Sequence, residues 1–338
     1  MGKKGILLIN LGTPDDPSRG AVYRYLKQFL LDYRVIDINT VQRNLLVRGL
    51  IAPFRSKSAS KLYQELWTDE GSPLKVYGYK LQELLQDAMG EEYIVELAMR
   101  YQSPSIESVI QKMLNEQYVS ELVIVPLFPH YASASTGSVY EEVMRLIAKE
   151  QAIPKLRFVN AFYEHPDFIA AFAERAKEHD IDSYDHVVFS YHGLPVRQLV
   201  KADRCGHCMQ SDDCCLEISH KNQHCYSAQC YATTKALVKE LGLKEGKYTT
   251  CFQSRLGKEP WREPYTTDVL QQRADAGDKR LLFLCPAFVA DCLETTIEVS
   301  VEYQEEFQEM GGEHVQLVES LNDHPTWVSA LKNIVLEV

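Results

Sequence analysis

Two strand-like segments of the 338-residue chain recur later in the same order. GILLINLGTP (residues 5–14) resembles HVVFSYHGLP (residues 186–195), and LVIVPLFPHYASASTGS (residues 122–138) resembles LLFLCPAFVADCLETTIE (residues 281–298). Each segment is a short apolar run that enters a turn with glycine or proline, and long helical patterns separate the runs. This alternation is typical of parallel sheets with crossover helices, so the repeat predicts a duplicated α/β unit.

The repeat predicts two similar domains, residues 1–154 and 155–338, with a boundary near Pro154. In open parallel sheets, ligands bind beyond the carboxyl ends of the strands, where all the repeated turns fall. We therefore expect the functional site in the cleft between the two domains. The first turn lacks the Gly-x-Gly-x-x-Gly spacing of dinucleotide sites, so a nucleotide cofactor is not expected.

The charge of the chain argues against nucleic acid as a partner, because 47 acidic and 36 basic residues give a net charge of −11 that repels phosphates. Residues 21–61 depart from this average, with eight lysines and arginines against two acids and with leucines and phenylalanines between them. The segment is predicted to form an amphipathic helix pair. It also fits a lip that touches anionic membrane or admits a large apolar anion.

The N-terminal apolar run is too short for a signal peptide, and no stretch reaches membrane-spanning length, so a cytoplasmic location is expected. Thiols stay reduced there, and the nine cysteines are an odd number. Metal ligation or burial is therefore a more fitting use for them than a disulfide framework.

His192 stands where an apolar strand ends and a turn begins, a place in which a lone histidine more often fixes structure than acts as a base. The other repeated strand end supplies acidic partners. A solvated charged face is the ordinary explanation for their spacing of three or four residues. A ridge that starts at the strand end would instead guide a divalent metal toward His192. The acidic residues are Asp291, Glu294, Glu298, Glu302, Glu305 and Glu309.

Longer segments of the chain also have a familiar pattern: INLGTP, RSKSASKLYQELWTDEGSPL, MRYQSP, PLFPHYASASTGS, SYHGLPVR, FQSRLGKEPWREPYT, CPAFVADCLETTIE and ESLNDHPTWVSAL. Together they resemble the ferrochelatases over nearly the whole chain. The resemblance implies two similar Rossmann-like domains, with parallel sheets flanked by helices, around a porphyrin cleft. It also implies an enzyme, a lyase of heme biosynthesis that inserts Fe²⁺ into protoporphyrin IX to form protoheme.

By this resemblance, His192 is the catalytic histidine and Glu294 the catalytic carboxylate, both also facing the substrate iron, and Glu298 continues the acidic row. Many members have histidine where this chain has Cys292. A neutral imidazole accepts a pyrrole proton, and glutamates relay it or coordinate ferrous iron. Positions that match residues near the macrocycle and its propionates are Leu11, Leu31, Tyr63, Ser72, Arg100, Tyr101, Tyr131, Ser133 and Ser135.

A polar loop, about residues 200–230, carries four cysteines within eleven residues, and many ferrochelatases lack this loop. The spacing favours ligation of zinc or of an iron–sulfur cluster. Because the second pair is adjacent in sequence, its side chains are expected to diverge, which favours [2Fe-2S], a cluster that some ferrochelatases carry. Cys225 or Cys230 is the alternative to one of that pair. The expected ligands are Cys205, Cys208, Cys214 and Cys215.

Three alternatives stay open. The chain is a chelatase for another metal, or it acts on coproporphyrin, or it is an iron–sulfur redox sensor with an idle chelatase cleft. An idle cleft is expected to lose His192 or Glu294, and both are present. Peripheral contact with the inner face of the cell membrane is a further expectation, and the oligomeric state is left open.

Overall fold

The computed structural model of the chain describes residues 2–211 and 213–338. It forms two compact units. Unit 1 comprises the described residues up to Phe128, together with Ser133–Asn160 and Leu331–Val338, and unit 2 comprises Pro129–Ala132 and Ala161–Ala330. The division into domains 1–154 and 155–338 stays a prediction.

The sheet of unit 1 has four parallel strands in the order β2-β1-β3-β4. Ile6 of β1 lies opposite Val95 of β2 and Val123 of β3, and all three side chains are buried. Strands that are covered on both faces read as continuous apolar runs, which is why these segments stand out in the sequence. The strands are β1 (Lys4–Asn10), β2 (Tyr93–Met99), β3 (Glu121–Pro126) and β4 (Lys155–Phe158).

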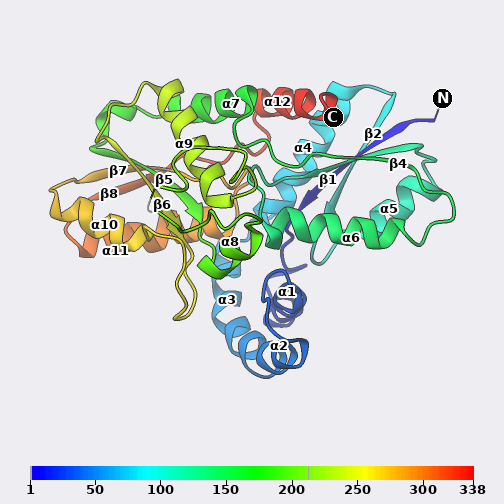
Figure 1. The fold of residues 1–338 in the computed structure, drawn as a ribbon, viewed down its shortest axis with the longest axis horizontal. Helices are drawn as coiled ribbons and strands as arrows, with labels where there is room; N and C mark the ends of the chain where they lie inside the picture. The colour runs from blue at the N-terminus through cyan, green and yellow to red at the C-terminus, as the bar shows by residue number, and fades with distance from the viewer. Residues whose placement is uncertain (1, 212) are drawn as a thin grey trace. The chain divides into compact units, whose positions relative to one another are not determined.

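Helices cover both faces of this sheet, with α4 on one face and α5 and α6 on the other (Figure 1). Leu7 and Ile9 of β1 pack in one cluster with Ile110 of α5 and Val143 of α6. The helices of unit 1 are α1 (Arg19–Leu31), α2 (Thr40–Leu46), η1 (Val47–Ile51), α3 (Ala52–Leu66), α4 (Pro73–Met89), α5 (Ile106–Asn115), η2 (Ser133–Gly137) and α6 (Ser138–Ile147).

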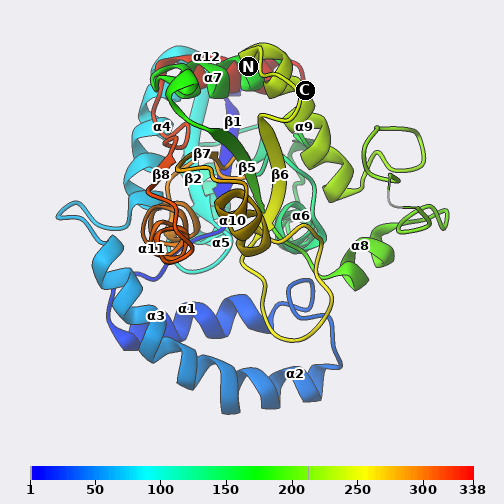
Figure 2. The ribbon, with the colours of Figure 1, turned by 90° about the vertical axis from the view of Figure 1, so that its left-hand side faces the viewer.

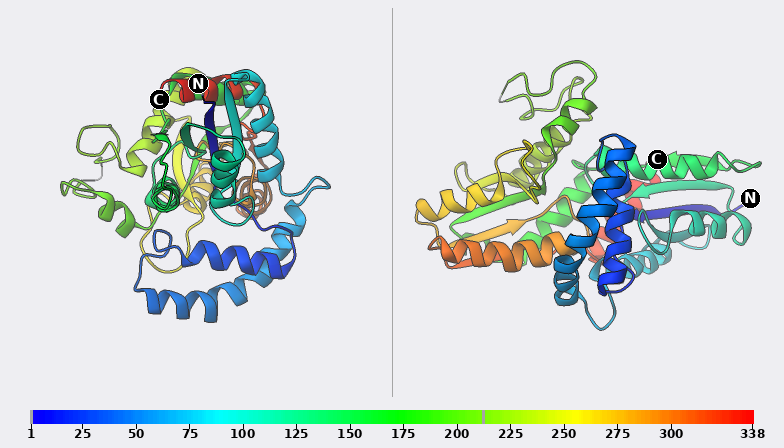
Figure 3. Two further views of the ribbon diagram at one scale, coloured as in Figure 1. Left: turned by 90° about the vertical axis from the view of Figure 1, so that its right-hand side faces the viewer. Right: turned by 90° about the horizontal axis from the view of Figure 1, so that it is seen from below.

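The basic segment of residues 21–61 forms the predicted helix pair. Helix α1 lies beside α3, and α2, η1 and α3 follow one another without a break from Thr40 to Leu66 (Figures 2 and 3). No helix in the part of the chain that the structure describes has the length and apolar character needed to cross a membrane.

Unit 2 repeats the sheet of unit 1, with four parallel strands in the order β6-β5-β7-β8. The repeated sequence segments fall on matching strands, because β1 corresponds to β5 and β3 to β7. The predicted duplication of an α/β unit is therefore confirmed. The strands are β5 (His186–His192), β6 (Tyr248–Gln253), β7 (Arg280–Leu284) and β8 (His314–Leu317).

In unit 2, α7 and α9 lie on one face of the sheet and α10 and α11 on the other (Figure 1). Val188 of β5 and Phe283 of β7 share a core cluster with Val269 of α10 and Phe307 of α11. The remaining helices are α7 (Pro166–Lys177), η3 (Ile181–Ser183), α8 (Val196–Ala202), α9 (Tyr226–Leu241), α10 (Thr266–Asp275), η4 (Leu293–Tyr303), α11 (Gln304–Glu309) and α12 (Pro325–Leu336).

The helix that carries the acidic row begins as a π-helix, η4, and continues as the α-helix α11. In unit 1, η2 is also a π-helix and follows the matching strand β3. π-Helical segments are rare and are frequently found at functional sites. The spacing of the acidic residues predicts a helix but does not distinguish the two kinds, because residues four apart lie on a similar side of both.

Candidate active site

His192 is the last residue of β5, and its side chain is half-buried. Its Nδ1 lies 2.7 Å from the carbonyl oxygen of Gly193. A carbonyl can only accept a hydrogen bond, so Nδ1 carries the proton of the neutral ring. The Nε2 atom therefore holds the lone pair, and His192 is oriented to act as a base through Nε2.

The turn after His192 fits closely against its neighbours. The Gly193 amide donates to the Gln253 carbonyl at 2.8 Å. A Cβ at this glycine would stand 2.9 Å from that carbonyl oxygen and 3.2 Å from the Trp261 ring, so a larger residue would force the turn outward. Trp261 and Phe288 lie near the imidazole, with ring centroids 6.3 and 6.5 Å from it. Neither aromatic residue was identified as part of the site from the sequence.

Gln253, the last residue of β6, connects the His192 turn to the π-helix. Its side-chain amide is buried, and its Nε2 donates to the Glu294 carbonyl at 2.7 Å and to the Glu298 carboxylate at 3.1 Å. Its Oε1 accepts from the Ser190 hydroxyl at 2.8 Å. Gln253 was not identified from the sequence. Its place at the end of an apolar strand was a signal in the sequence, whereas its position directly opposite His192 follows from the sheet register.

The Glu298 carboxylate is held by three donors. Besides Gln253, it accepts from the Ser254 hydroxyl at 2.6 Å and from the Tyr303 hydroxyl at 2.7 Å. Burial and the neighbouring Glu298 charge raise the pKa of Tyr303, so this hydroxyl stays protonated and donates. Such a set of hydrogen bonds fixes the carboxylate in one orientation.

Glu294 is bound differently, because its backbone carbonyl accepts from Gln253 while its half-buried carboxylate hydrogen-bonds the Cys292 thiol. Burial, followed by the nearby Glu294 charge, raises the pKa of Cys292, which keeps the thiol protonated. The cysteine that stands where many ferrochelatases have histidine is thus a hydrogen-bond partner of Glu294.

The two ends of the predicted acidic row differ. Asp291 accepts from the Asn322 amide at 2.7 Å and from the Ser320 backbone at 3.1 Å, so it anchors a loop. At the other end, burial and then repulsion by neighbouring glutamates raise the pKa of Glu306, which the sequence reasoning did not include. This repulsion indicates that the acidic side chains of η4 and α11 do crowd together. Glu302, Glu305 and Glu309 are exposed.

Several predicted porphyrin contacts follow the strand ends of unit 1. The Arg100 amide donates to the Asn10 carbonyl at 2.8 Å, and the Tyr101 amide donates to the Leu11 carbonyl at 2.9 Å. Both side chains bind Asp32, the Arg100 guanidinium at 2.9 Å and the Tyr101 hydroxyl at 2.9 Å. Tyr101 is fully buried, whereas Arg100 is half-buried.

The other predicted porphyrin contacts have mixed surroundings. Tyr63 and Ser72 are buried, and the Ser72 hydroxyl donates to the Thr13 hydroxyl at 3.0 Å. Tyr131 belongs to unit 2, where its amide donates to the Gln229 side chain at 2.7 Å. Half-buried positions are Leu11, Leu31, Tyr131, Ser133 and Ser135.

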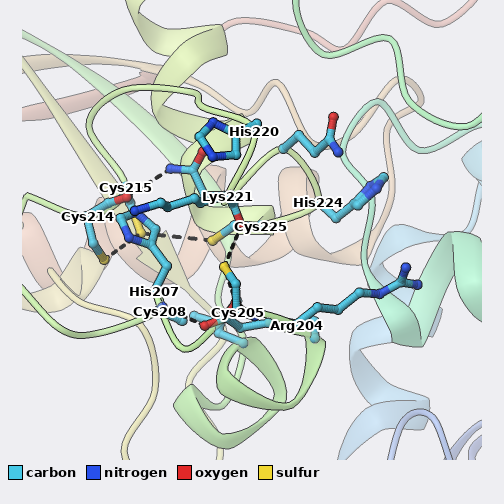
Figure 4. Close-up of a pocket in the computed structure, with 15 residues that line it drawn as sticks. Arg204, Cys205, His207, Cys208, Cys214, Cys215, His220, Lys221, His224 and Cys225 are labelled. Carbon is cyan, nitrogen blue, oxygen red and sulfur yellow. Dashed lines mark hydrogen bonds between the residues drawn. The ribbon is translucent and has the colours of Figure 1, made fainter.

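In the cysteine loop, four sulfur atoms follow one another in contact (Figure 4). The sulfurs of Cys214 and Cys215 are 3.5 Å apart, those of Cys215 and Cys225 are 4.0 Å apart, and Cys225 in turn hydrogen-bonds Cys208. The expectation that the adjacent pair diverges is wrong. Cys214 and Cys215 lie inside a turn closed by the Leu216 amide and the Asp213 carbonyl, not in an extended strand that would send them to opposite sides.

Cys205, the first cysteine of the loop, lies outside this chain of sulfurs. Its thiol donates to Asp203 at 3.3 Å and to the Lys221 carbonyl at 3.5 Å. The Asp203 carboxylate also accepts from the amides of Cys208 and Cys205, which lower the pKa of this carboxyl to about 2. Cys230 is fully buried in α9.

A cavity of about 310 Å³ is lined by Cys205, Cys208, Cys214, Cys215 and Cys225 among other loop residues. As the side chains stand in residues 2–211 and 213–338, no three His, Cys, Asp or Glu groups are arranged to hold a single metal ion.

Comparison with known proteins agrees with these features over the full length. The ferrochelatase of Legionella pneumophila (strain Lens) is 44% identical over 335 residues, which cover 99% of this chain and 99% of that protein. The ferrochelatase of Coxiella burnetii (strain Dugway 5J108-111) is 42% identical over 332 residues, which cover 97% of this chain and 92% of that protein.

Two solved structures share the fold. SirB from Bacillus subtilis with Fe³⁺ has a TM-score of 0.52 at 14% identity, covering 99% of this chain and 95% of that chain. The sirohydrochlorin chelatase SirB from Bacillus subtilis subspecies spizizenii in complex with cobalt has a TM-score of 0.51 at 13% identity, covering 99% and 94%. The profile of the family described as ferrochelatase matches residues 3–338. The chain therefore belongs to the ferrochelatase family.

Proposed function

We propose that this protein inserts Fe²⁺ into protoporphyrin IX to form protoheme, the ferrochelatase reaction of heme biosynthesis. The observation that carries the proposal is the hydrogen-bond connection through Gln253. Its backbone binds the turn after His192, and its side chain binds both Glu294 and Glu298. Gln253 thus connects three residues, one that carries a potential base and two that carry carboxylates. Such a set suits a reaction that removes protons and binds a metal cation.

The reaction releases two protons for each iron, because both pyrrole N–H groups of the porphyrin must ionise as the metal binds the ring nitrogens. His192 accepts a proton at Nε2, since its Nδ1 proton is held by the Gly193 carbonyl. Glu294 and Glu298 either relay protons away or bind the incoming Fe²⁺, a cation that carboxylate and imidazole ligands both suit. The less restrained Glu294 is the better proton carrier.

Most of the residues proposed to recognise the macrocycle belong to unit 1, whereas Tyr131 belongs to unit 2. Arg100 provides a guanidinium for a propionate, and the half-buried Leu11 and Leu31 provide apolar wall. Because Asp32 already binds Arg100, the guanidinium is held in one orientation. The remaining proposed contacts are Tyr63, Ser72, Tyr101, Tyr131, Ser133 and Ser135.

Anaerobic mixing of the purified protein with ferrous iron and protoporphyrin tests the proposal, with formation of protoheme followed by absorbance. His192→Ala is expected to lose at least about 100-fold in kcat while porphyrin binding, followed by fluorescence, persists. His314→Ala, a half-buried histidine on β8, is the matched control and is expected to keep its activity. Activity of His192→Ala within a few-fold of the parent would contradict the assignment. Faster turnover with coproporphyrin or with cobalt would assign another substrate.

We further propose that the cysteine loop binds a [2Fe-2S] cluster. Two thiolates on one tetrahedral metal, at about 2.3 Å each, lie roughly 3.8 Å apart. The 3.5 Å between the sulfurs of Cys214 and Cys215 is close to that value, so these two thiolates would share one iron, and Cys225 would pair with Cys208 on the other. Cys208 supplies the fourth thiolate, and its pKa is lowered because Cys225 donates a hydrogen bond to it. These contacts favour Cys225 over Cys205 as the remaining ligand.

A matched pair of serine variants tests the ligand set. Cys225→Ser is expected to be colourless and free of acid-labile sulfide, whereas Cys205→Ser is expected to stay red-brown with two irons per chain. The reverse result would restore Cys205, Cys208, Cys214 and Cys215 as the ligands. About one zinc and no sulfide in the parent protein would overturn the cluster itself.

We also propose that the α2–α3 segment rests on the inner face of the cell membrane. Four apolar side chains are exposed along it: Val41 (67%), Leu45 (71%), Leu50 (54%) and Phe54 (70%). Arg48, Arg55 and Lys57 lie between or beside them, and basic residues near an apolar face attract anionic lipid.

Sedimentation with vesicles tests this contact. The protein is expected to bind vesicles that contain phosphatidylglycerol and to bind pure phosphatidylcholine vesicles more weakly. Phe54→Ser should weaken binding, whereas Tyr118→Ser, an equally exposed aromatic residue outside the segment, should not. Equal binding of the two variants would rule out the segment as the contact.

A further inference from the structure

We infer that Tyr226 is a positioning residue for His192 and that it couples the state of the cysteine loop to the catalytic turn. Tyr226 is the first residue of α9 and follows Cys225 directly. Its hydroxyl donates to the His192 backbone carbonyl at 2.9 Å. The inference rests on the proposed role of His192, and it adds a residue through which the cysteines act on that role.

The Tyr226 ring is fixed by buried neighbours. It packs edge-on against the ring of His130, with centroids 5.9 Å apart, and both side chains are buried. His130 in turn lies 2.8 Å from the Thr233 hydroxyl, which donates to the Tyr163 carbonyl at 2.6 Å. The phenol therefore has little freedom to move without the helix that carries it. Burial also raises the pKa of Tyr226, so its hydroxyl remains a donor.

A second contact ties the same turn of α9 to the same catalytic turn. The fully buried Ser227 hydroxyl accepts from the Arg262 side chain at 2.8 Å. The Arg262 amide donates to the Leu194 carbonyl at 2.9 Å. Ser227 also hydrogen-bonds the Cys215 thiol. Tyr226 thus contacts the start of the turn from His192 to Leu194 directly, and Ser227 is linked to its end through Arg262. Both residues adjoin cysteines of the sulfur row.

Cys225 occupies the N-cap position of α9, directly before Tyr226, although its side chain makes no capping hydrogen bond. When its thiol is held with Cys208 and Cys215, Tyr226 and Ser227 are held as well. Release of the thiol lets the first turn of the helix fray. The His192 carbonyl then loses its donor, and the imidazole, whose Nδ1 is bound one residue further on, loses its orientation. Tyr226 acts through His192 and does not itself need to touch the substrate.

A double-mutant cycle tests the coupling, using the full-length protein with Tyr226→Phe, Cys225→Ser and both changes together. Tyr226→Phe is expected to lower kcat roughly 3- to 10-fold, the loss of an ordinary hydrogen bond, with the KM for protoporphyrin unchanged. Cys225→Ser is expected to lower kcat as well, and the double variant should lose no more than the larger single effect. Tyr248→Phe is the matched control and should match the parent, because the Tyr248 hydroxyl donates to Glu245 at the opposite end of β6 from Gln253.

Resonances of the His192 imidazole in histidine-labelled protein give a readout that does not depend on turnover. They are expected to shift in Cys225→Ser, and to show no further shift when this change is added to Tyr226→Phe. Additive losses of kcat, or unchanged His192 resonances in Tyr226→Phe, would overturn the inference. Failure of the parent to insert iron would refute the proposed function instead, and the iron and sulfide content separately tests the cluster.

Discussion

The Ser254 hydroxyl donates a 2.6 Å hydrogen bond to the Glu298 carboxylate from a backbone with φ of 67°. This left-handed conformation is uncommon for any residue but glycine, and such strain concentrates at functional sites. The two neighbouring glutamates consequently differ. The Glu298 carboxylate is fixed by three donors, whereas the Glu294 carboxylate hydrogen-bonds the Cys292 thiol.

Replacement of Ser254 by alanine should release Glu298 on one side. We expect kcat/KM for Fe²⁺ to fall roughly 10-fold, because a hydrogen bond to a charged group contributes about 1.5 kcal/mol or more. Steady-state kinetics with varied iron measures this, and the exposed Ser329→Ala serves as the control. An unchanged kcat/KM for iron would mean that Glu298 does not need Ser254.

Two members of the acidic row, Glu294 and Glu305, should respond differently to loss of their charge. Glu294→Gln is expected to lower kcat at least about 100-fold, because Glu294 is bound by Gln253, the residue that also binds the turn after His192. Glu305→Gln, on the exposed face of α11, is expected to stay within about 3-fold of the parent. Single-turnover formation of protoheme measures both. Equal effects would make the row an ordinary solvated face.

Gln253→Glu should destabilise the fold although the side chain keeps its shape. The variant replaces an amide donor with a second carboxylate beside Glu298, so we expect a loss of about 2–3 kcal/mol in the free energy of unfolding at pH 8. The loss should shrink as the pH falls, because a protonated carboxyl donates again. Urea unfolding measures it, with the exposed Gln272→Glu as control. An undisturbed midpoint would contradict the role of Gln253.

Because of the buried His186, we expect the free energy of unfolding to fall in acid. Burial, then the Arg273 and Lys247 charges, lower the pKa of His186 to about 4. Between pH 6.5 and 4 the unfolded chain therefore binds a proton that the folded protein refuses, so stability falls as the pH falls through this range. We expect His186→Gln to remove on the order of 1–3 kcal/mol of this acid sensitivity. Parallel curves of unfolding free energy against pH for parent and variant would refute it.

The sequence predicted the sheets well because their strands are covered on both faces. Buried parallel strands are uninterrupted apolar runs, so the ends of β1, β3, β5 and β7 were visible as repeats. His192 and Glu294 were predicted as site residues because His192 ends β5 and Glu294 lies in the helix that follows β7. Gln253 was missed because it adjoins His192 through the pairing of β6 with β5, and Trp261 because an isolated bridge to Pro195 brings it there. Nothing local in the sequence specifies either contact.

The cysteine loop shows what spacing leaves open. Compact spacing predicts Cys205 as a ligand, and the structure adds a contact that spacing does not indicate, from that thiol to Asp203 two residues away. Cys225 returns to the sulfur row across ten residues because the chain folds back to begin α9. Neither the carboxylate partner nor the return of the chain can be read from intervals between cysteines. The π-helical form of η4 was likewise beyond a pattern that residues four apart satisfy in either helix.

The matching turns after β1 and β5 share a glycine and differ in the residue before it. In the aligned segments Leu11 of the first copy stands where His192 stands in the second, and each is followed by a glycine, Gly12 and Gly193. A side chain would strike the Tyr101 carbonyl at one glycine and the Gln253 carbonyl at the other. Both turns therefore require glycine at this position for steric reasons. The position before the glycine has no such shared requirement, so two matching turns hold one ionisable side chain and one apolar one.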